Sequence, residues 1–552
     1  MRRSDLHDIL AAEENHRRRA LEVIARRGAP RPIDGSALLP RITRGRLVLA
    51  TSRSRHRGIA TFATTFLGHQ GWLVRSARVS LLIDPILCEE FGDAYALGYR
   101  IYPPRDLRLD AFPAIDALFL THEHDDHFDI ASLAKLDRRI PVFLSTHSSS
   151  AGFAILREMG FVVRPLVPGV PVAIGDLEMI AFCGDHLSVN SDDEWDALPF
   201  MVRHREGAGS FFTMVDIMMI PGHLEWARAC APRPGLVTWT NNTLDWSFMA
   251  DYVPDAVVRD AGTEACTERM ETGRQLLERH WGRPAAMLMC AGGFTFHGDR
   301  RWLNDRVFGI DTEAVCRTIG SHHPNERFVS TVPGQTFRME ANRLVAVEER
   351  TPFLGALPRE QWPLRRRDLR MAVPDYPPAT GRRELGDGDD ERLAAGLQEL
   401  ANVLVGGILF RSLHSMLTVM AGERRPTFAL VLREGDAGAT RVFEYDASAC
   451  MFVAGATGRA RDVYLAGIEC WASDLLAVLH GELGPITLAY GRATFWNALP
   501  QGFRFDLFEA LYRLSHPLRR PADFLKTYRR LWDENRSVLP TVAFARVAAA
   551  VA

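Results

Sequence analysis

The chain has 552 residues, more than one hydrophobic core normally organises, so two or three domains are expected. Hydrophobic residues make up 47% and charged residues 24%, which excludes a disordered or membrane-embedded chain. Lys and Arg number 66 against 68 Asp and Glu, and the resulting net charge of -2 provides no global attraction to nucleic acid or to anionic membranes.

The eight cysteines are scattered, without a Cys-x-x-Cys pair, which favours free thiols in a reduced compartment over a disulfide framework. The first residues carry charges without an apolar segment behind them, so no signal peptide is expected. The chain contains no run of about 18 apolar residues, so no membrane span is expected. We therefore expect a cytoplasmic protein with a small-molecule substrate and no membrane or nucleic-acid partner.

Residues 1–59 predict a helical arm, with a helix ending near Gly28 and proline-containing turns after it. Such an arm suits packing on a second subunit, so a homodimer is one expectation and a solvated helix is the other. From residue 60 the pattern changes to short apolar segments. Residues 72–74 and 79–83 predict a hairpin closed by Asp84-Pro85.

The mostly apolar run 115–120 predicts a buried strand that stops at Thr121, followed by a helix over residues 130–136. Further strands are expected at 141–144, 162–167, 172–174, 177–182, 211–214, 236–239 and 285–290, with an amphipathic helix at 269–280. Strands that then alternate with helices indicate a layered α/β domain over residues 60–350.

Residues 351–385 are rich in proline and arginine and predict a linker. Beyond the linker, helical segments at 391–413 and 469–480 flank two strand-like segments at 427–432 and 441–445. Residues 386–552 therefore predict a separate C-terminal α+β domain.

The loop after Thr121 places three histidines and two aspartates in six positions: His122, His124, Asp125, Asp126 and His127. Loops at strand ends are where function concentrates, because a rigid sheet holds them. Imidazole nitrogens and carboxylate oxygens are ligands for zinc, iron and manganese. A single histidine there would be a solvated turn residue, but this density of ligand-type residues indicates a metal site.

Three residues outside this loop are candidate partners for it. Asp84 ends a strand and is expected to orient a ligand histidine; a turn-initiating Asp-Pro is the alternative. His186 and Asp216 each follow a strand-like run. A terminal ligand and a bridging carboxylate suit a dinuclear site, because two cations held close together repel each other unless anionic ligands lie between them.

Gly68-His69, Asp84-Pro85, the segment from Thr121 to His127, His186 and Asp216 together resemble the metallo-β-lactamase fold superfamily, over about residues 60–345. The resemblance implies an αββα sandwich with metals at the edge where strands end. It also implies a divided ligand set bridged by Asp216, with His122, His124 and His186 on one metal and Asp126 and His127 on the other. By the same resemblance, His69 lies near the metals without binding one.

The chain departs from that family at its end, where a histidine usually follows the last strand. The corresponding segment, residues 327–337, has no histidine. His297 is the preferred substitute because it follows the apolar run 285–290, and it is expected to act with Asp126 in catalysis. The alternative pair, His322-His323, precedes Pro324 in a polar turn that is typical of solvated histidines.

A second resemblance is less specific. Residues 291–294, 333–336, 475–496 and 505–514 are similar to segments of the CMP-N-acetylneuraminate and UDP-N-acetylmuramate hydroxylase group, which joins this fold to a Rieske iron–sulfur domain. The chain lacks the paired Cys-x-His and Cys-x-x-His motifs of a Rieske centre, so an oxygenase of this kind would need an external electron donor. Residues 472–483 also resemble sterol-carrier-like modules, with a dimerisation or lid domain as the alternative.

Three functions follow from the ligand set. The preferred one is a non-haem iron oxygenase or oxidase of a small molecule, because the missing histidine and the second resemblance point away from hydrolases. The alternative is a zinc or manganese hydrolase that attacks an ester, amide or phosphodiester with a bridging hydroxide. A non-catalytic protein with a structural metal is the third, although the set supplies too many ligands for one tetrahedral ion.

Overall fold

The computed structural model describes residues 47–49, 60–92, 98–182, 196–217, 219–240, 255–291, 294–305, 311–362, 379–381, 383–406, 408–456, 458–484, 487–488, 492–497 and 520–545. The chain forms two compact units. The sandwich unit comprises residues 45–245, 256–371 and 525–552, and the second unit comprises residues 1–44, 246–255 and 372–524.

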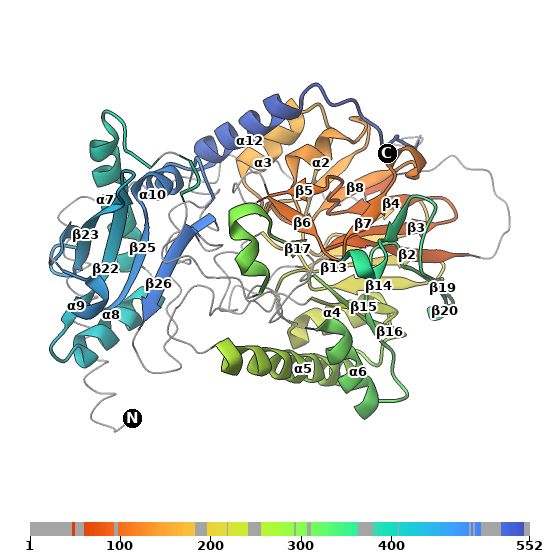
Figure 1. Cartoon of the computed structure of the whole chain (residues 1–552). Helices are drawn as coiled ribbons and strands as arrows, with labels where there is room; N and C mark the ends of the chain where they lie inside the picture. The colour runs from red at the N-terminus through yellow and green to blue at the C-terminus, as the bar shows by residue number, and fades with distance from the viewer. Residues whose placement is uncertain are drawn as a thin grey trace. The chain divides into compact units, whose positions relative to one another are not determined.

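Two eight-stranded sheets form the centre of the sandwich unit (Figure 1). The first sheet has the order β10 (Val163–Leu166), β9 (Val142–Ser145), β8 (Ala117–Leu120), β4 (Ser80–Ile83), β3 (Gly71–Ser76), β2 (Phe62–Gly68), β19 (Thr336–Glu340) and β20 (Arg343–Glu348). The second has the order β1 (Leu47–Leu49), β11 (Val172–Ile174), β12 (Leu177–Ala181), β13 (Phe200–His204), β14 (Ser210–Thr213), β15 (Leu236–Thr240), β16 (Ala286–Cys290) and β18 (Phe328–Ser330).

The two sheets pack face to face through large apolar side chains. Alternate residues of a strand point to the same face, so each sheet presents a row of aromatic and branched residues to the other. The ring of Phe119 meets that of Phe200 edge to face at 5.0 Å between centroids, and Trp72 lies 4.9 Å from Phe211. These side chains are fully buried, so the main core of the unit lies between the sheets.

Helices cover the outer faces. On the second sheet, α4 (Pro221–Cys230), α5 (Asp255–His280) and α6 (Thr312–His322) bury Leu224, Met270 and Ile319 against strands β13 to β16. Figure 1 shows α5 and α6 side by side along this face. On the other side of the sandwich lie α2 (Ile130–Ala134) and α3 (Ser150–Glu158). The αββα arrangement confirms the predicted fold class.

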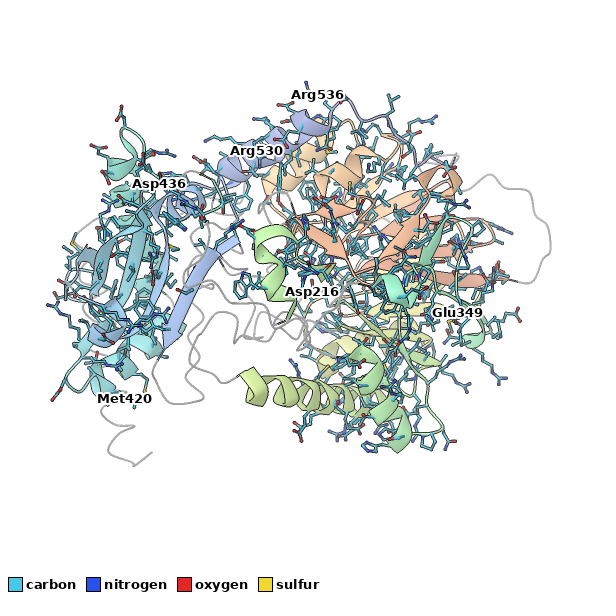
Figure 2. The ribbon with its side chains drawn as sticks, viewed as in Figure 1. Asp216, Glu349, Met420, Asp436, Arg530 and Arg536 are labelled. Carbon is cyan, nitrogen blue, oxygen red and sulfur yellow. The ribbon has the colours of Figure 1, made fainter. Side chains whose placement is uncertain are left out.

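The strand directions bring distant loops to one edge of the sandwich. Strands β4, β8 and β9 run parallel, as do β14, β15, β16 and β18. The loop after β8 begins at Thr121, and Asp216 follows β14. Figure 2 labels Asp216 among the strands of the sandwich unit. The polar residues that follow these strands therefore gather at the edge where the strands end.

Smaller elements complete the sandwich unit. Strands β5 (Glu90–Phe91), β6 (Tyr99–Ile101) and β17 (Phe294–Thr295) form a three-stranded sheet, and η3 (Leu109–Ala111), η5 (Gly298–Asp305) and η6 (Arg359–Gln361) are short 3-10 helices. Strand β21 (Leu354–Ala356) pairs with β7 (Arg105–Leu107). The beginning of the expected linker, residues 351–385, is therefore folded into the sandwich unit. It could not be recognised in the sequence because a three-residue strand among prolines has no periodicity.

The predicted N-terminal arm, residues 1–59, is described only at Leu47–Leu49, which form β1. This strand pairs in parallel with β11 at the edge of the second sheet. The helix expected to end near Gly28 lies outside the described residues.

The second unit combines one five-stranded sheet with helices. Its sheet has the order β24 (Met451–Ala454), β23 (Ala439–Asp446), β22 (Arg425–Glu434), β25 (Tyr464–Trp471) and β26 (Ala493–Asn497). Helices α7 (Asp389–Gly406), α8 (Ile408–Met420), α9 (Ala460–Val463) and α10 (Ala472–Leu479) accompany the sheet, and residues of α7, α8 and α10 share its core.

The C-terminal end of the chain departs from the expected range of this domain, residues 386–552. Helix α12 (Pro521–Asn535) passes into the sandwich unit, and residues 525–552 belong to that unit. Ile115 and Ala543 are joined by a backbone hydrogen bond of 2.9 Å. An amphipathic helix near a chain end does not indicate on which core it packs, so only the tertiary structure decides its place.

Within the described residues, no single helix combines the length and apolar character of a membrane span. Residues 389–405 and 410–420 pass that test only as a pair, and they are bent by 88° relative to one another.

Candidate metal centre

The loop after β8 is fastened to the end of β4 through Asp84. The carboxylate of Asp84 accepts hydrogen bonds from the backbone N–H of Thr121 (2.8 Å) and from its hydroxyl (2.6 Å). Asp84 itself has a φ of 41°, an uncommon backbone conformation for a residue other than glycine. Both residues are buried. The first turn of the loop is therefore held rigidly against the sheet.

His127 lies between two carboxylates, and this fixes the use of its two ring nitrogens. Its Nδ1 lies 2.8 Å from Asp84 Oδ2, and its Nε2 lies 2.9 Å from Asp216 Oδ2. A carboxylate on Nδ1 orients the imidazole and leaves Nε2 to act as a ligand, the arrangement found around many metal-bound histidines.

A first group of potential ligands consists of His122, His127 and Asp216. Their donor atoms all lie within 4.8 Å of one another. His122 Nε2 is 3.5 Å from Asp216 Oδ2, so this oxygen faces both histidines. The other oxygen of Asp216 accepts a hydrogen bond of 2.6 Å from Gln70. The carboxylate is thus held with one oxygen toward the histidines.

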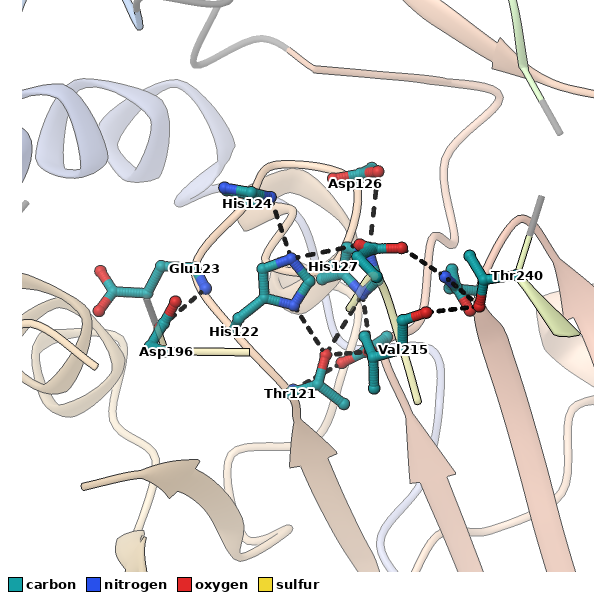
Figure 3. A network of polar contacts seen from close by, with 12 residues as sticks. Thr121, His122, Glu123, His124, Asp126, His127, Asp196, Val215 and Thr240 are labelled. Atoms are coloured by element: carbon teal, nitrogen blue, oxygen red, sulfur yellow. Dashed lines mark hydrogen bonds and ion pairs between the residues drawn. The ribbon is translucent and has the colours of Figure 1, made fainter. Parts of the chain in front are cut away.

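A second group consists of His69, Asp126 and His127. His69 Nε2 lies 2.7 Å from Asp126 Oδ2, which is also 3.7 Å from His127 Nε2. His69 stands in the tight turn between β2 and β3 with a φ of 52°. The turn thus places the imidazole beside the loop that follows β8. Figure 3 labels Asp126 and His127 in the polar network of this loop.

Burial and mutual charge shift the pKa values in the cluster in opposite directions. Burial raises the pKa of Asp216, but the charge and the hydrogen bond of His127, together with the charge of His69, hold this pKa below its ordinary value. Burial lowers the pKa of His127, and the carboxylates of Asp126 and Asp216 more than reverse the effect. Burial, with the neighbouring charge of His127, lowers the pKa of His122. The site therefore stabilises positive charge between its carboxylates, as a cation site must.

Two further buried carboxylates lie behind the loop. Glu123 accepts hydrogen bonds from the backbone N–H and hydroxyl of Ser149, and the Tyr528 hydroxyl lies 3.3 Å from it. Asp196 accepts from the backbone of Glu123 at 3.2 Å and from Ser148 at 2.7 Å. Burial raises the pKa of both carboxyls, and the charge of Asp196 raises that of Glu123 further.

Five of the residues predicted as metal ligands or their neighbours meet in these groups: His69, His122, Asp126, His127 and Asp216. Asp84 contacts the groups through His127. His124 is buried with Nδ1 3.0 Å from His122 Nε2, but it belongs to neither group of three. His186 lies outside the described residues.

The substitute histidines lie elsewhere. His297 Nε2 faces Glu90 at 3.5 Å, its side chain is 38% exposed, and it belongs to neither group. His323 binds Glu271 at 2.7 Å at the end of α6, and His322 is exposed. The imidazole that joins Asp126 and His127 in the described residues is that of His69.

Sequence reasoning did not single out Gln70, Glu123 or Tyr528 for this site. Gln70 occupies a turn, where glutamine is unremarkable, and its link to Asp216 spans 146 positions. Tyr528 lies 405 positions from Glu123. The one available signal was the charged Glu123 between two candidate ligands, because an acid in that position must find buried partners.

The donor set fits a metal. Imidazole nitrogens and carboxylate oxygens converge at a buried edge, and a carboxylate orients His127 from behind. An imidazole Nε2 binds one cation only, so His127 cannot complete both groups. A second cation therefore requires a further ligand, such as His124 or the predicted His186.

Comparison with known proteins agrees with this arrangement. Residues 80–231 match the beta-lactamase superfamily domain. Uncharacterized proteins of Mycobacterium bovis and Mycobacterium tuberculosis are 31% identical over 117 residues, which is 21% of this chain. The match spans 28% of the length of these relatives.

Among solved structures, an isothiocyanate hydrolase from Delia radicum gut bacteria is similar at 17% identity with a TM-score of 0.35, over 50% of this chain and 98% of that one. CmlA, a diiron beta-hydroxylase from Streptomyces venezuelae, is similar at 13% identity with a TM-score of 0.32, over 52% of this chain and 55% of that one.

Proposed function

We propose that the chain is a metal-dependent hydrolase of a small-molecule ester, amide or phosphodiester, because residues 80–231 match the beta-lactamase superfamily domain. The observation that carries the proposal is the position of His69. His69 supplies an imidazole to the group of Asp126 and His127. It can thereby replace the histidine that usually follows the last strand and that this chain lacks. The missing histidine was one of the two reasons to prefer oxidation, together with the resemblance to the hydroxylase group.

The ligands divide in the proposal between two cations. His122, with His124 and His186, would hold one, and His69, Asp126 and His127 would hold the other. Asp216 would be shared between them, since its Oδ2 faces both His122 and His127. Bound zinc or manganese would lower the pKa of a water and polarise the substrate oxygen.

Side chains of the site orient the proposed ligands and accept a proton during the reaction. Gln70 holds the orientation of the Asp216 carboxylate, and Asp84 holds that of the His127 ring. Neither ligand therefore has to reorient during the reaction, which would cost free energy. Asp126 is proposed to accept the proton of the attacking water, because its side chain is 20% exposed, whereas those of His69 and Asp216 are 1% and 4% exposed.

The oxidative function is the second candidate. His122, His127 and Asp216 form a set of two histidines and one carboxylate, which is the donor set of many non-haem iron oxygenases. In that case the cation is iron, and an external electron donor is required.

Metal analysis and two activity assays separate the candidates. Protein purified without added metal is analysed for zinc, manganese and iron, then tested for hydrolysis of lactones, amides and phosphodiesters and for oxygen uptake. Stoichiometric zinc or manganese with hydrolysis is expected. Iron together with substrate-dependent oxygen uptake would overturn the hydrolase in favour of the oxygenase.

Replacement of single histidines tests the ligand assignment. His69→Ala is expected to remove one of the two metal equivalents, whereas His297→Ala and the surface control His322→Ala keep both. Loss of metal in His297→Ala with full content in His69→Ala would return the second position to His297.

A further inference from the structure

An arginine-lined pocket lies at the edge of the sandwich opposite the metal centre. The pocket has a volume of about 510 Å³, and four arginines are among its lining residues: Arg233, Arg283, Arg327 and Arg343. Trp281, Pro234 and Pro284 also line it. A volume of this size is typical of small-molecule sites in proteins.

Strand direction places the pocket away from the metals. Arg233 precedes β15, Arg283 precedes β16 and Arg327 precedes β18, and these three strands are parallel. Asp216 follows β14, which is also parallel to β15, so it lies at the other end of the strands. Five residues of strand span roughly 16 Å, so a ligand of ordinary size cannot bridge the two sites.

Most of the positive charge in the pocket is not neutralised by the protein. Arg283 pairs with Glu278 at 2.6 Å and lies 3.7 Å from Glu326. In the part of the chain that the structure describes, no ion pair joins Arg233, Arg327 or Arg343 to a carboxylate. Three arginines without a carboxylate partner therefore line one pocket, and their like charges repel one another and attract anions.

The pocket arginines could instead have a structural role, in which they bind the backbone carbonyl groups at the nearby ends of α4 and α5. Other groups already occupy those carbonyls. Trp281 donates to the carbonyl of Ala231 at 2.6 Å, and Arg203 donates to that of Cys230. The carbonyl of Leu277 accepts the backbone N–H groups of residues 281 and 282. In the described residues, no hydrogen bond joins the side chains of Arg233, Arg327 or Arg343 to these carbonyls.

We propose that this pocket binds a small soluble polyanion that carries two or more phosphate groups. Guanidinium groups match phosphate oxygens in geometry and remain charged at any physiological pH. Each arginine can bind a phosphate group through two hydrogen bonds, so three unpaired arginines can bind more than one phosphate group. The pocket volume of about 510 Å³ admits a compact molecule between them. The pocket is a second ligand site, independent of the reaction at the metal centre.

Binding of fructose 1,6-bisphosphate to the full-length, metal-loaded protein tests the proposal by calorimetry, with inorganic phosphate as the weaker probe. The bisphosphate is expected to bind at one site, about tenfold or more tightly than phosphate, because it makes more charge-assisted hydrogen bonds. The double variant Arg327→Gln/Arg343→Gln is expected to weaken binding at least about tenfold. Arg317→Gln, an exposed arginine of α6, is the matched control and should bind like the parent.

Three outcomes would overturn the proposal. The first is that the parent protein does not bind the bisphosphate. This includes the case in which the protein binds only phosphatidylcholine vesicles that contain phosphatidic acid. The second is binding that the double variant retains in full. The third is binding abolished by His122→Ala but not by the double variant, which would place the anion at the metal centre. Circular dichroism of the variants confirms that they are folded.

Discussion

At the scale of single residues, the metal centre depends on side chains that hold the ligands as much as on the ligands. Asp84 binds both Thr121 and His127, and Gln70 binds Asp216. Each of these contacts reaches a ligand from the side away from the other ligands. Precise ligand direction is what such supporting contacts provide.

Asp84→Asn tests the supporting role directly. The amide cannot stabilise the oriented imidazole of His127 as a carboxylate does, so metal affinity is expected to fall by about 10- to 100-fold. Competition with a fluorescent chelator measures the change. Asp110→Asn, at an exposed position of η3, serves as the control, and equal affinity of the Asp84 variant and the parent would contradict the role.

The buried Glu123 and Asp196 predict a pH dependence of stability. Burial raises the pKa of Glu123 in the folded protein, so the folded state holds a proton that the unfolded state releases as the pH rises above the ordinary glutamate value of about 4.3. The contribution of this group is full below that pH and is lost as the pH rises toward the raised pKa.

Glu123→Gln removes this titration, because the amide stays neutral and keeps acceptors and donors near Ser149. The free energy of unfolding of metal-free protein is expected to decline less steeply with rising pH in the variant than in the parent. Denaturant titrations between pH 5 and 8 measure the two slopes. Identical slopes would show that Glu123 is ionised in the folded state.

At the scale of elements, the C-terminal segment supports both flanks of the metal loop. Residues 541 and 542 donate to the backbone carbonyl of Lys135, just after α2, and residue 543 accepts from Ile115, just before β8. Within α12, the ring of Tyr528 lies 5.4 Å from that of Phe128, tilted by 41°, and its hydroxyl lies 3.3 Å from Glu123. A segment without any ligand thus contacts the loop from three directions.

Tyr528→Phe removes one hydrogen bond to a buried acid and keeps the ring. We expect a loss of about 1 kcal/mol in the free energy of unfolding, since a carboxylate loses one of its donors. Weaker metal binding should accompany this loss, because Glu123 stands between two predicted ligands. Arg530→Gln, on the exposed side of the same helix, is the control for denaturation and metal titration. A variant as stable as the parent would mean that water replaces the hydroxyl.

At the scale of the whole molecule, the two units have separate hydrophobic cores. Metal ligands occur only in the sandwich unit among the described residues. A cation that binds the folded state stabilises the unit that holds it and not the other.

Chelation is therefore expected to lower the midpoint of one thermal transition and leave a second unchanged. Differential scanning calorimetry of the full chain with and without a chelator measures both. A single transition that shifts as a whole would show that the two units unfold together. His122→Ala should reproduce the effect of the chelator without any additive.

The sequence by itself determined the chemistry of the loop and the class of the fold. Both are local properties: five ligand-type residues follow one buried strand, and short apolar segments recur at strand and helix periods. The hairpin at residues 72–83 and the strand over residues 285–290 were predictable for the same reason, since each forms its pattern within a few residues.

Only the tertiary structure decided which distant residues meet that loop. His69 and Gln70 reach it because β2 and β3 pair and turn at the correct edge, and Tyr528 reaches it because α12 packs on the sandwich. Three of the four arginines of the second pocket come together because three parallel strands begin at one edge, and the fourth, Arg343, begins β20 of the other sheet. Strand order and packing determine which distant residues come into contact, and the spacing of residues along the chain does not reveal either of them.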